Sequence, residues 1–419
     1  MKLLISSYSC APNRGSEHAV GWNWITHAHR LGHQVWALVA PNHEASVTKA
    51  CQEDPELAGI TWRFPTVPGW PLQQAIEPEW ERTYNLFWQV RAAAMARRLH
   101  AEIGFDVLHH LTWGGVRAPT FLGFIDAPLI VGPVGGGETS PRSLRDAFHP
   151  RARITEEVRD LSNHTITINP LVRHGLSSAD VIFTKTPDTG RILTPAMQRK
   201  SVNFLELGLE AVNADRPPRP PGPPRLLFAG RLLYWKGAHI AIRALAELVR
   251  TVPDARLTVV GKGREEARLR ADAAALGVAG NVDFVPWLAQ QALFELYQTH
   301  DLFVFPSLHD SSGNAVLESL SFGLPVVCLD VGGPAQIVTP GSGVIVSTAG
   351  RNTQQVATAM AADIAQIIHT PERLQALSAG AAARAAQFKL PVRVSQFYGM
   401  VEQMVATRHP IAVPNALAG

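Results

Sequence analysis

Short runs of apolar residues alternate with longer amphipathic stretches along most of this chain. Strands that are apolar throughout and separated by helices are typical of parallel sheets covered by helices on both faces. The runs that predict strands lie at residues 3–6, 35–39, 107–111, 129–134 and 181–184, and again at 225–229, 257–260, 282–285, 302–305 and 325–329. The stretches that predict helices lie at 17–31, 238–251, 265–276, 290–299 and 315–322. The pattern therefore predicts an α/β protein with two doubly wound domains that face each other across a cleft.

A proline-rich segment divides the chain near its middle. Six prolines stand within residues 215–224, which excludes a helix or a central strand and predicts a stiff, exposed connector. We therefore assign residues 1–212 to an N-terminal domain, 213–224 to a linker and 225–391 to a C-terminal domain. The remainder, residues 392–419, begins with apolar residues at helical spacing and predicts a final helix.

The composition narrows the class of protein. Apolar residues make up 46% of the chain and charged residues 17%, so real cores can form and a largely disordered chain is excluded. The net charge is only +3, and residues 1–212 hold equal numbers of basic and acidic residues, so we expect no nucleic-acid partner. The cysteines Cys10, Cys51 and Cys328 lack paired spacing, which excludes a disulfide scaffold and fits a reducing cytoplasm. No apolar run is long enough for a membrane span, so we expect a soluble protein.

Two loops after predicted strands in the second half carry candidate chemistry. Gly261 opens a Gly-x-Gly turn, which fits a dinucleotide site and a plain strand-to-helix turn equally well. Arg231 and Lys236 stand five residues apart in a loop that begins at Gly230. Two separated cations on a loop at the carboxyl end of a strand suit the two phosphates of a pyrophosphate.

A third loop, between the strand at 302–305 and the helix that follows it, carries the strongest signal. Residues 313–315 begin that helix, whose free backbone N–H groups form an anion site, and Ser312 is the predicted N-cap. Glu318 lies about one turn inside the helix, where an ionised carboxylate accepts hydrogen bonds from vicinal hydroxyls such as those of ribose. Asp310 stands on the loop, within reach of sugar hydroxyls.

Taken together and in order, these segments resemble a known enzyme family. Asp310 and Glu318, with seven residues between them, resemble the E-x7-E motif of retaining nucleotide-sugar glycosyltransferases, specifically family 4 (group 1) with the GT-B fold of two Rossmann-like domains. The further segments that match are the glycine loop at 15–17, the turn and strand at 31–35, the "fDvvH" strand at 105–110, the "GRl…KG" loop at 230–237 and the closing segment at 322–326 and 332–333. The resemblance covers residues 1–345 in outline and is most specific in 225–345.

The resemblance implies a role for each matching residue. Arg231 and Lys236 are expected to hold the donor diphosphate, and Glu318 the nucleotide ribose. The other residues that the resemblance places at the donor are Asp310, Gly313, Asn314 and Ala315 for the transferred sugar, Gly15 near the diphosphate, and Trp287 and Leu288 for the base. Gly230 and Gly261, in the loops described above, are the remaining expected donor-binding residues. Asp310 is one methylene shorter than the family's glutamate, so its contacts with the sugar are expected to differ.

The histidines of the strand near residue 107 depart from the family's His-x-His pattern, because His109 and His110 are adjacent. Side chains alternate along a strand, so only one of the two can face the cleft. His109 keeps the position of the family's first histidine and is the expected catalytic residue, with His110 as the alternative if the strand ends early.

The activity implied by the resemblance is retaining transfer of a hexose from a nucleotide-diphosphate sugar of the GDP-mannose or UDP-glucose type. The implied acceptor is a glycan or a lipid-linked oligosaccharide, in exopolysaccharide or lipopolysaccharide synthesis. Arg231 and Lys236 supply the positive charge that the departing diphosphate needs, and no Asp-x-Asp motif follows a suitable strand, so we expect no cofactor and no metal. In this fold the final helix, within 392–419, is expected to cross back to the N-terminal domain.

Residues 82–100 contain arginines and aromatic residues but no acidic residue. Such a helix fits contact with an anionic membrane surface, which implies a peripheral location on the inner face of the membrane, and fits a solvated helix equally well.

Three other functions compete with the leading one. Within the same fold, the chain can be a nucleotide-sugar epimerase or a glycosyltransferase with a small-molecule acceptor. An NAD-dependent oxidoreductase is disfavoured because Glu266 stands where the dinucleotide fingerprint needs a third small residue. A non-catalytic sugar-nucleotide-binding protein is disfavoured because Arg231, Lys236 and Glu318 are all present.

Overall fold

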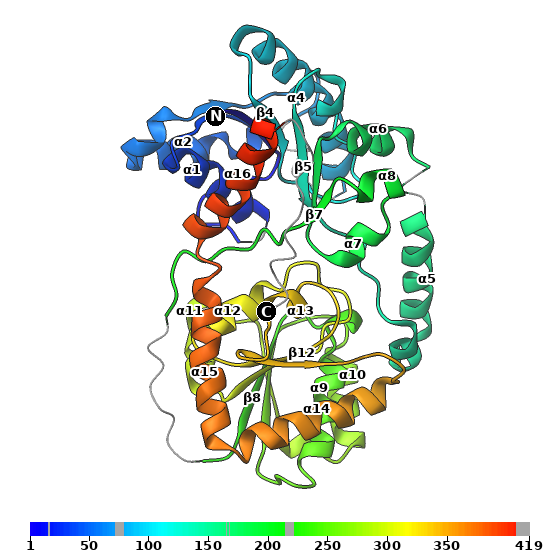
Figure 1. The fold of residues 1–419 in the computed structure, drawn as a ribbon. Helices are drawn as coiled ribbons and strands as arrows, with labels where there is room; N and C mark the ends of the chain where they lie inside the picture. The colour runs from blue at the N-terminus through cyan, green and yellow to red at the C-terminus, as the bar shows by residue number, and fades with distance from the viewer. Residues whose placement is uncertain (16, 72–78, 165, 167, 214–221, 408–419) are drawn as a thin grey trace. The chain divides into compact units, whose positions relative to one another are not determined.

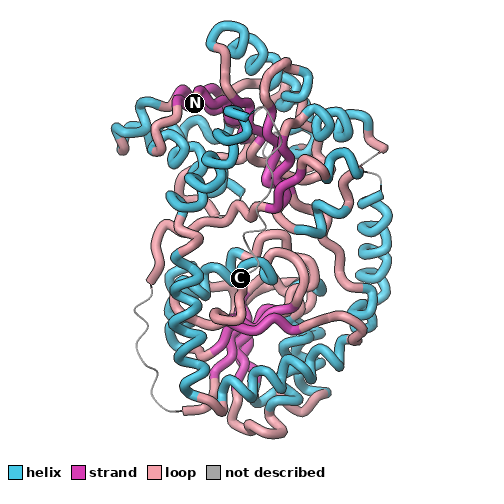
Figure 2. Tube along the Cα trace, in the orientation of Figure 1, coloured by secondary structure: helices cyan, strands magenta, loops and turns pink. Residues whose placement is uncertain are grey.

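The computed structural model describes all residues except 16, 72–78, 165, 167, 214–221 and 408–419. The described residues form two compact α/β units. Many of their elements are labelled in Figure 1, and Figure 2 colours them by type. The first unit comprises Met1–Gly137, Ser162–Glu206 and the segment from Leu390 on, and the second comprises Glu138–Leu161 and Leu207–Lys389. The prediction of two parallel-sheet, doubly wound domains is confirmed.

The first unit contains a parallel sheet whose described strands run in the order β3-β2-β1-β4-β5-β6-β7. These strands are β1 (Lys2–Ser7), β2 (Gln34–Val39), β3 (Thr61–Arg63), β4 (Val107–His110), β5 (Leu129–Val134), β6 (Val181–Thr184) and β7 (Ser201–Asn203). The α-helices of this unit are α1 (Glu17–Arg30), α2 (Glu44–Glu53), α4 (Glu81–Ile103), α6 (Pro170–Ser178), α7 (Pro187–Arg191), α8 (Pro195–Gln198) and α16 (Leu390–Thr407). The order reverses between β1 and β4, and ligands bind at such a switch point in open α/β sheets.

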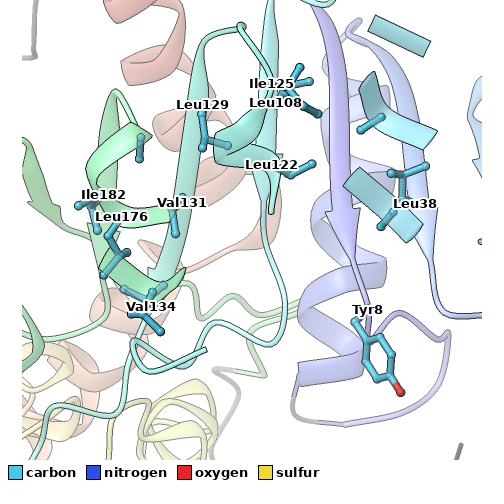
Figure 3. Close-up of a cluster of buried hydrophobic side chains, with 14 of the residues drawn as sticks. Tyr8, Leu38, Leu108, Leu122, Ile125, Leu129, Val131, Val134, Leu176 and Ile182 are labelled. Atoms are coloured by element: carbon cyan, nitrogen blue, oxygen red, sulfur yellow. The ribbon is translucent and has the colours of Figure 1, made fainter. Parts of the chain in front are cut away.

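Two apolar clusters cover the two faces of this sheet. One contains Leu108 together with Val131 and Ile182 from neighbouring strands, and Figure 3 shows these side chains with Leu122, from the 3-10 helix Leu122–Phe124, and Leu176, from α6. The other cluster contains Val107 and Phe397, the latter from α16. Adjacent residues of β4 therefore enter opposite clusters, as the pleat of a strand requires, and this alternation decides where its histidines lie.

The second unit contains a parallel sheet whose described strands run in the order β10-β9-β8-β11-β12-β13. Its strands are β8 (Arg225–Ala229), β9 (Arg256–Val260), β10 (Val282–Val285), β11 (Leu302–Phe305), β12 (Val326–Leu329) and β13 (Gly343–Val346). Its α-helices are α9 (Ala238–Leu248), α10 (Glu266–Ala275), α11 (Gln290–Thr299), α12 (Asn314–Ser321), α13 (Pro334–Ile337), α14 (Thr353–Ile368) and α15 (Pro371–Ala386). Helix α9 packs against α14 and helix α12 against α15, and Figure 1 shows the sheet between these two groups.

The division between the units differs from the predicted boundary at residue 212. Residues 138–161, which hold a short 3-10 helix, η4 (Arg142–Ala147), and most of α5 (Pro150–His164), belong to the second unit. The side chain of Thr353 donates to the carbonyl oxygen of Leu144 at 3.3 Å, and Arg268 donates to the carbonyl of Ala147. These are contacts across long stretches of sequence, which a local hydrophobic pattern cannot reveal.

The structure also describes part of the two remaining predicted segments, the final helix and the linker. Helix α16 packs against α1 in the first unit, the unit to which the sequence analysis assigned it. Most of the predicted linker, 213–224, lies outside the described residues. Across the described helices, none combines the length and the apolar character that a transmembrane span requires.

Candidate functional site

Two loops meet at the carboxyl ends of the neighbouring strands β8 and β11 in the second unit. The first, residues 230–237, follows β8, contains the 3-10 helix η5 (Tyr234–Lys236) and leads into α9. The second, residues 306–313, follows β11 and leads into α12. These loops carry most of the residues that the sequence analysis placed at a donor.

Direct contacts hold the two loops together. The carbonyl oxygen of Trp235 accepts hydrogen bonds from the Leu308 backbone N–H at 2.8 Å and the Ser307 hydroxyl at 3.2 Å. The Trp235 ring also stacks on the His309 ring, with centroids 5.2 Å apart. Gly237 completes the junction with φ of +78°, and a Cβ at this position would lie 1.9 Å from the carbonyl oxygen of Pro306. Only glycine allows the backbones to approach this closely.

Lys236 and Asp310 form an ion pair between the loops. The Lys236 Nζ lies 2.5 Å from the Asp310 Oδ2, and the Asp310 carboxylate also accepts backbone N–H groups from Ser312 and Gly313, each at 3.2 Å. Burial raises the pKa of Asp310, but the charge and hydrogen bond of Lys236, with the two N–H groups, outweigh it and hold this pKa below its usual value. The carboxylate is therefore ionised, and the ammonium is positioned with part of its surface open to an anion.

The start of α12 provides backbone donors beside this pair. Gly313 is the N-cap, in a left-handed conformation, and no side chain caps the helix, so the prediction of Ser312 as the cap is wrong. The first helical hydrogen bonds run from the N–H groups of Val316 and Leu317 to the carbonyl oxygen of Gly313. The N–H groups of Asn314 and Ala315 stand ahead of this ladder, where an anion can bind.

Glu318, one turn into α12, presents a carboxylate supported by a buried tyrosine. The Tyr297 hydroxyl donates to the Glu318 Oε2 at 3.4 Å. Burial raises the pKa of Glu318, and the hydrogen bond from Tyr297 offsets part of this rise. The other lone pairs of the carboxylate can accept hydroxyl groups.

Gly332 and Gly333, which follow β12, pack closely against the loop that carries Asp310. The Gly333 N–H donates to the carbonyl oxygen of Asp310 at 2.7 Å, and a Cβ on Gly332 would lie 2.3 Å from that same oxygen. This packing is the physical reason for the glycine doublet at 332–333. A similar close approach explains Gly261, since a Cβ there would lie 2.0 Å from the carbonyl oxygen of Gly230.

The remaining donor-site candidates of this unit are more exposed. The Arg231 side chain is exposed and forms no hydrogen bond or ion pair with the described residues. Trp287 follows β10 and is 63% exposed, whereas Leu288 beside it is half-buried. In the described part of the chain, no group of three or more histidine, cysteine, aspartate or glutamate side chains could hold a metal ion.

The histidines of β4 lie in the first unit and differ from expectation. His109 is fully buried, donates from Nε2 to the carbonyl oxygen of Gly132 at 2.7 Å and accepts at Nδ1 from the Tyr398 hydroxyl at 3.0 Å. Its ring stacks on Phe397, and burial lowers its pKa to about 4. His109 is thus a neutral core residue that joins β4 to α16, and the expectation that it contacts substrate is corrected.

The other first-unit candidates are His110 and Gly15. His110, on the opposite face of β4, is also buried. Burial lowers its pKa to about 4, and a hydrogen bond with the Trp113 backbone, which raises the pKa, offsets only part of this effect. Gly15 is exposed, on the loop between β1 and α1 at the switch point of the sheet. The two residues therefore differ sharply in access to solvent.

The sequence analysis missed one residue that contacts both loops of this site. Glu156 on α5 is fully buried and bonds to Tyr234 and His309, one on each loop. The sequence does not show that a glutamate in a polar helix is buried at the site, because its burial depends on packing against residues about 80 and 150 positions away.

One comparison with known proteins covers the part of the chain that contains this site. Residues 212–384, which contain both loops and α12, match the family described as glycosyl transferases group 1. This part of the chain, which contains the candidate donor site, is therefore similar to the group 1 glycosyltransferases.

Particular relatives can be named for parts of the chain. It is 35% identical over 194 residues to D-inositol 3-phosphate glycosyltransferase of Segniliparus rotundus, covering 45% of this chain and 40% of that protein. It is 36% identical over 143 residues to glycogen synthase of Mycobacterium tuberculosis, covering 33% of this chain and 34% of that protein. The chain thus spans well under half the length of these relatives.

Solved structures resemble almost the whole chain. HepE of Anabaena in complex with UDP aligns over 96% of this chain and 100% of its own, with a TM-score of 0.59 and 16% identity. Sucrose-phosphate synthase from Thermosynechococcus elongatus aligns over 97% and 99%, with a TM-score of 0.62 and 17% identity. These similarities confirm the GT-B fold class.

Proposed function

We propose that this protein is a retaining hexosyltransferase that uses a nucleotide-diphosphate sugar as donor. The observation that carries the proposal is the Lys236–Asp310 pair beside the start of α12, within the part of the chain that is similar to the group 1 glycosyltransferases. HepE has been crystallised with UDP and with UDP-glucose, which supports a donor of this class.

The mechanism follows from the charge that develops when the anomeric C–O bond breaks. Negative charge grows on the departing diphosphate, and Arg231, Lys236 and the N–H groups of Asn314 and Ala315 stabilise it in the transition state. Asp310 positions Lys236 and accepts hydroxyls of the transferred sugar, whose ring becomes oxocarbenium-like. Glu318 binds the ribose hydroxyls. Because these groups supply the stabilising charge, we propose that transfer needs no metal and no other cofactor.

For the acceptor we propose a glycan or lipid-linked oligosaccharide, in the synthesis of a surface polysaccharide. A small-molecule acceptor is the second candidate, because the relatives include enzymes named for D-inositol 3-phosphate and sucrose phosphate. Transfer from the same labelled donor to lipid-linked oligosaccharides and to small polyols or sugar phosphates separates the two, since only one class is expected to become labelled.

The donor site is tested by calorimetric titration with UDP, GDP, ADP and NAD in the presence of EDTA. We expect one nucleoside diphosphate to bind and NAD not to bind. Glu318→Ala should weaken binding of that nucleotide by at least about 10-fold, the loss of one to two hydrogen bonds to a charged group, and leave inorganic pyrophosphate binding unchanged. Two results would contradict the proposal: binding of NAD alone by the wild type, or an equal weakening of nucleotide and pyrophosphate binding in Glu318→Ala.

The same titration has an expected pH dependence. A carboxylate accepts hydrogen bonds from both ribose hydroxyls, whereas a protonated Glu318 must donate one. Because the folded pKa of Glu318 lies above its ordinary value of 4.5, nucleotide binding should weaken as the pH falls through that raised pKa. Glu318→Gln, which cannot titrate, should remove this part of the pH dependence.

A membrane surface is a further partner that we propose, at α4 in the first unit. Exposed apolar side chains on and just before this helix are Trp80, Leu86, Phe87 and Val90, and exposed arginines are Arg82, Arg91, Arg97 and Arg98. Apolar side chains that enter the headgroup region beside cations that bind anionic lipids are typical of peripheral membrane helices. The arrangement supports a peripheral location at the cytoplasmic face of a membrane.

The membrane proposal is tested by sedimentation with vesicles of phosphatidylcholine, with and without the anionic lipid phosphatidylglycerol. We expect the protein to bind the anionic vesicles, and Phe87→Glu to lower the bound fraction several-fold. Leu276→Glu, at an exposed apolar position in the second unit, is the matched control and should bind like the wild type. Equal binding by both variants would place the membrane contact elsewhere.

A further inference from the structure

A carboxylate from the first half of the sequence lies between the two loops of the donor site. Glu156 on α5 has 0% of its side chain exposed. Its Oε1 accepts hydrogen bonds from the Tyr234 hydroxyl at 2.9 Å and the His309 Nε2 at 3.1 Å, and its Oε2 accepts the Ser140 N–H at 3.1 Å. Burial raises the pKa of Glu156, but these three partners, led by His309, outweigh it and lower the pKa to about 2. The buried carboxylate is therefore ionised and satisfied by three donors.

The two side-chain partners of Glu156 are close neighbours of the donor-site ion pair along the chain. Tyr234 precedes Lys236 by two residues in η5, and His309 immediately precedes Asp310. A shift of either loop would break a hydrogen bond to a buried charge, which costs more than the loss of a neutral one. One carboxylate therefore constrains both loops at the point where Lys236 and Asp310 meet.

The segment that carries Glu156 is itself held on the second unit. The guanidinium of Arg145 donates to the carbonyl oxygen of Ser140 at 2.8 Å and pairs with Asp160 at 2.9 Å. Phe148 packs edge-on against Tyr234, with ring centroids 4.9 Å apart. With the Thr353 and Arg268 contacts described above, these interactions make residues 138–161 a fixed support for the loops.

We propose that Glu156 is a positioning residue of the donor site, which holds Lys236 and Asp310 in place through Tyr234 and His309. The inference rests on the proposed function, because it assigns Glu156 to the binding of a nucleotide-diphosphate donor. Glu156 does not contact the donor. Its effect is to keep the two loops in the arrangement that binds the diphosphate before the donor arrives, which lowers the free-energy cost of binding.

The test uses the full chain with Glu156→Gln, which keeps the size of the side chain and removes its charge. We expect the Kd of the nucleoside diphosphate and the KM of the donor sugar to rise about 10-fold, the loss of roughly one charge-assisted hydrogen bond, with the acceptor KM unchanged. A purely structural role would lower the fraction of active protein, so the apparent kcat would fall with both KM values unchanged. Glu157→Gln is the matched control, since Arg145 keeps Asp160 when the exposed Glu157 loses its charge.

Double variants test whether the effect passes through the two side chains. Tyr234→Phe and His309→Asn should each raise the donor KM less than Glu156→Gln does, and each should add little in combination with it, because the interactions share one carboxylate. Additive losses would overturn the proposal. If Glu156→Gln fails to fold, Tyr234→Phe removes a single hydrogen bond and carries the same measurements.

Hydrogen–deuterium exchange without ligand separates failure of this inference from failure of the proposed function. Glu156→Gln should speed exchange in peptides that cover residues 230–237 and 306–313 and leave the control peptide 353–368 unchanged. If the wild type bound no nucleoside diphosphate, the donor assignment would fail while exchange still reported on the loops. Wild-type exchange in Glu156→Gln, or faster exchange without a rise in Kd, would overturn the role of Glu156.

Discussion

Lys236→Ala is expected to lower kcat for glycosyl transfer by about 10²–10³-fold, the usual cost of removing one preorganised group that stabilises developing negative charge. The substitution removes the ammonium that faces the diphosphate and also leaves the Asp310 carboxylate with only its backbone partners. Two charges of the site are thus affected by one change. Steady-state kinetics with the donor identified by calorimetry measure the effect.

The stability of this variant has an expected pH dependence. The lowered pKa of Asp310 contributes stability that is present above the ordinary value of 3.8 and is lost as the pH falls through the folded pKa. Without Lys236 this contribution shrinks, so the variant should melt below the wild type near neutral pH, and the gap should narrow in acid. Arg250→Ala is the control and should keep activity and melting temperature, because the exposed Arg250 lies just beyond the end of α9, where it pairs with Glu247. Near-normal activity of Lys236→Ala would contradict the site.

Gly237→Ala is expected to destabilise the second unit by about 2–5 kcal/mol, combining a left-handed backbone penalty with overpacking. The added methyl group would lie 1.9 Å from the carbonyl oxygen of Pro306, so the two donor-site loops must separate. Because Lys236 is the preceding residue, we also expect nucleoside diphosphate binding to fall at least 10-fold, roughly the effect of losing one charge-assisted contact. Thermal melting and calorimetry measure the two effects.

Gly277→Ala is the matched control for this prediction. Gly277 has a φ of +74°, close to that of Gly237, but a Cβ there meets no atom within 4 Å. The control should therefore show only the backbone penalty of about 1–2 kcal/mol and normal nucleotide binding. Equal effects in the two variants would mean that the contact with Pro306 does not hold the loops.

Much of the fold follows from local sequence patterns. The apolar runs at 129–134, 181–184 and 302–305 predict strands, and the structure has β5, β6 and β11 with these same bounds. Such strands can be predicted from the sequence because a strand buried on both faces must be apolar along its whole length. The short edge strands β3, β7 and β13 were not predicted, since an edge strand needs fewer apolar residues and its pairing depends on the neighbouring strand.

The site was predictable to the extent that its residues are close in sequence. Asp310, Gly313 and Glu318 lie on one loop and helix, and Lys236 lies on the loop of the adjacent strand, so motif spacing and parallel topology were enough to bring them together. His109 shows the limit of this reasoning. Which face of β4 packs against α16 is settled by residues almost 290 positions away, which no pattern around the strand contains.

The sequence by itself determined the two parallel sheets, the residue types of the candidate donor site and the glycines that its loops require, because these depend on local periodicity, spacing and backbone geometry. Only the tertiary structure decided that residues 138–161 belong to the second unit, that His109 is a core residue and that Glu156 lies between Tyr234 and His309. The physical reason is that burial of a polar side chain is set by partners distant in sequence, and a buried charge is identified by the donors that surround it.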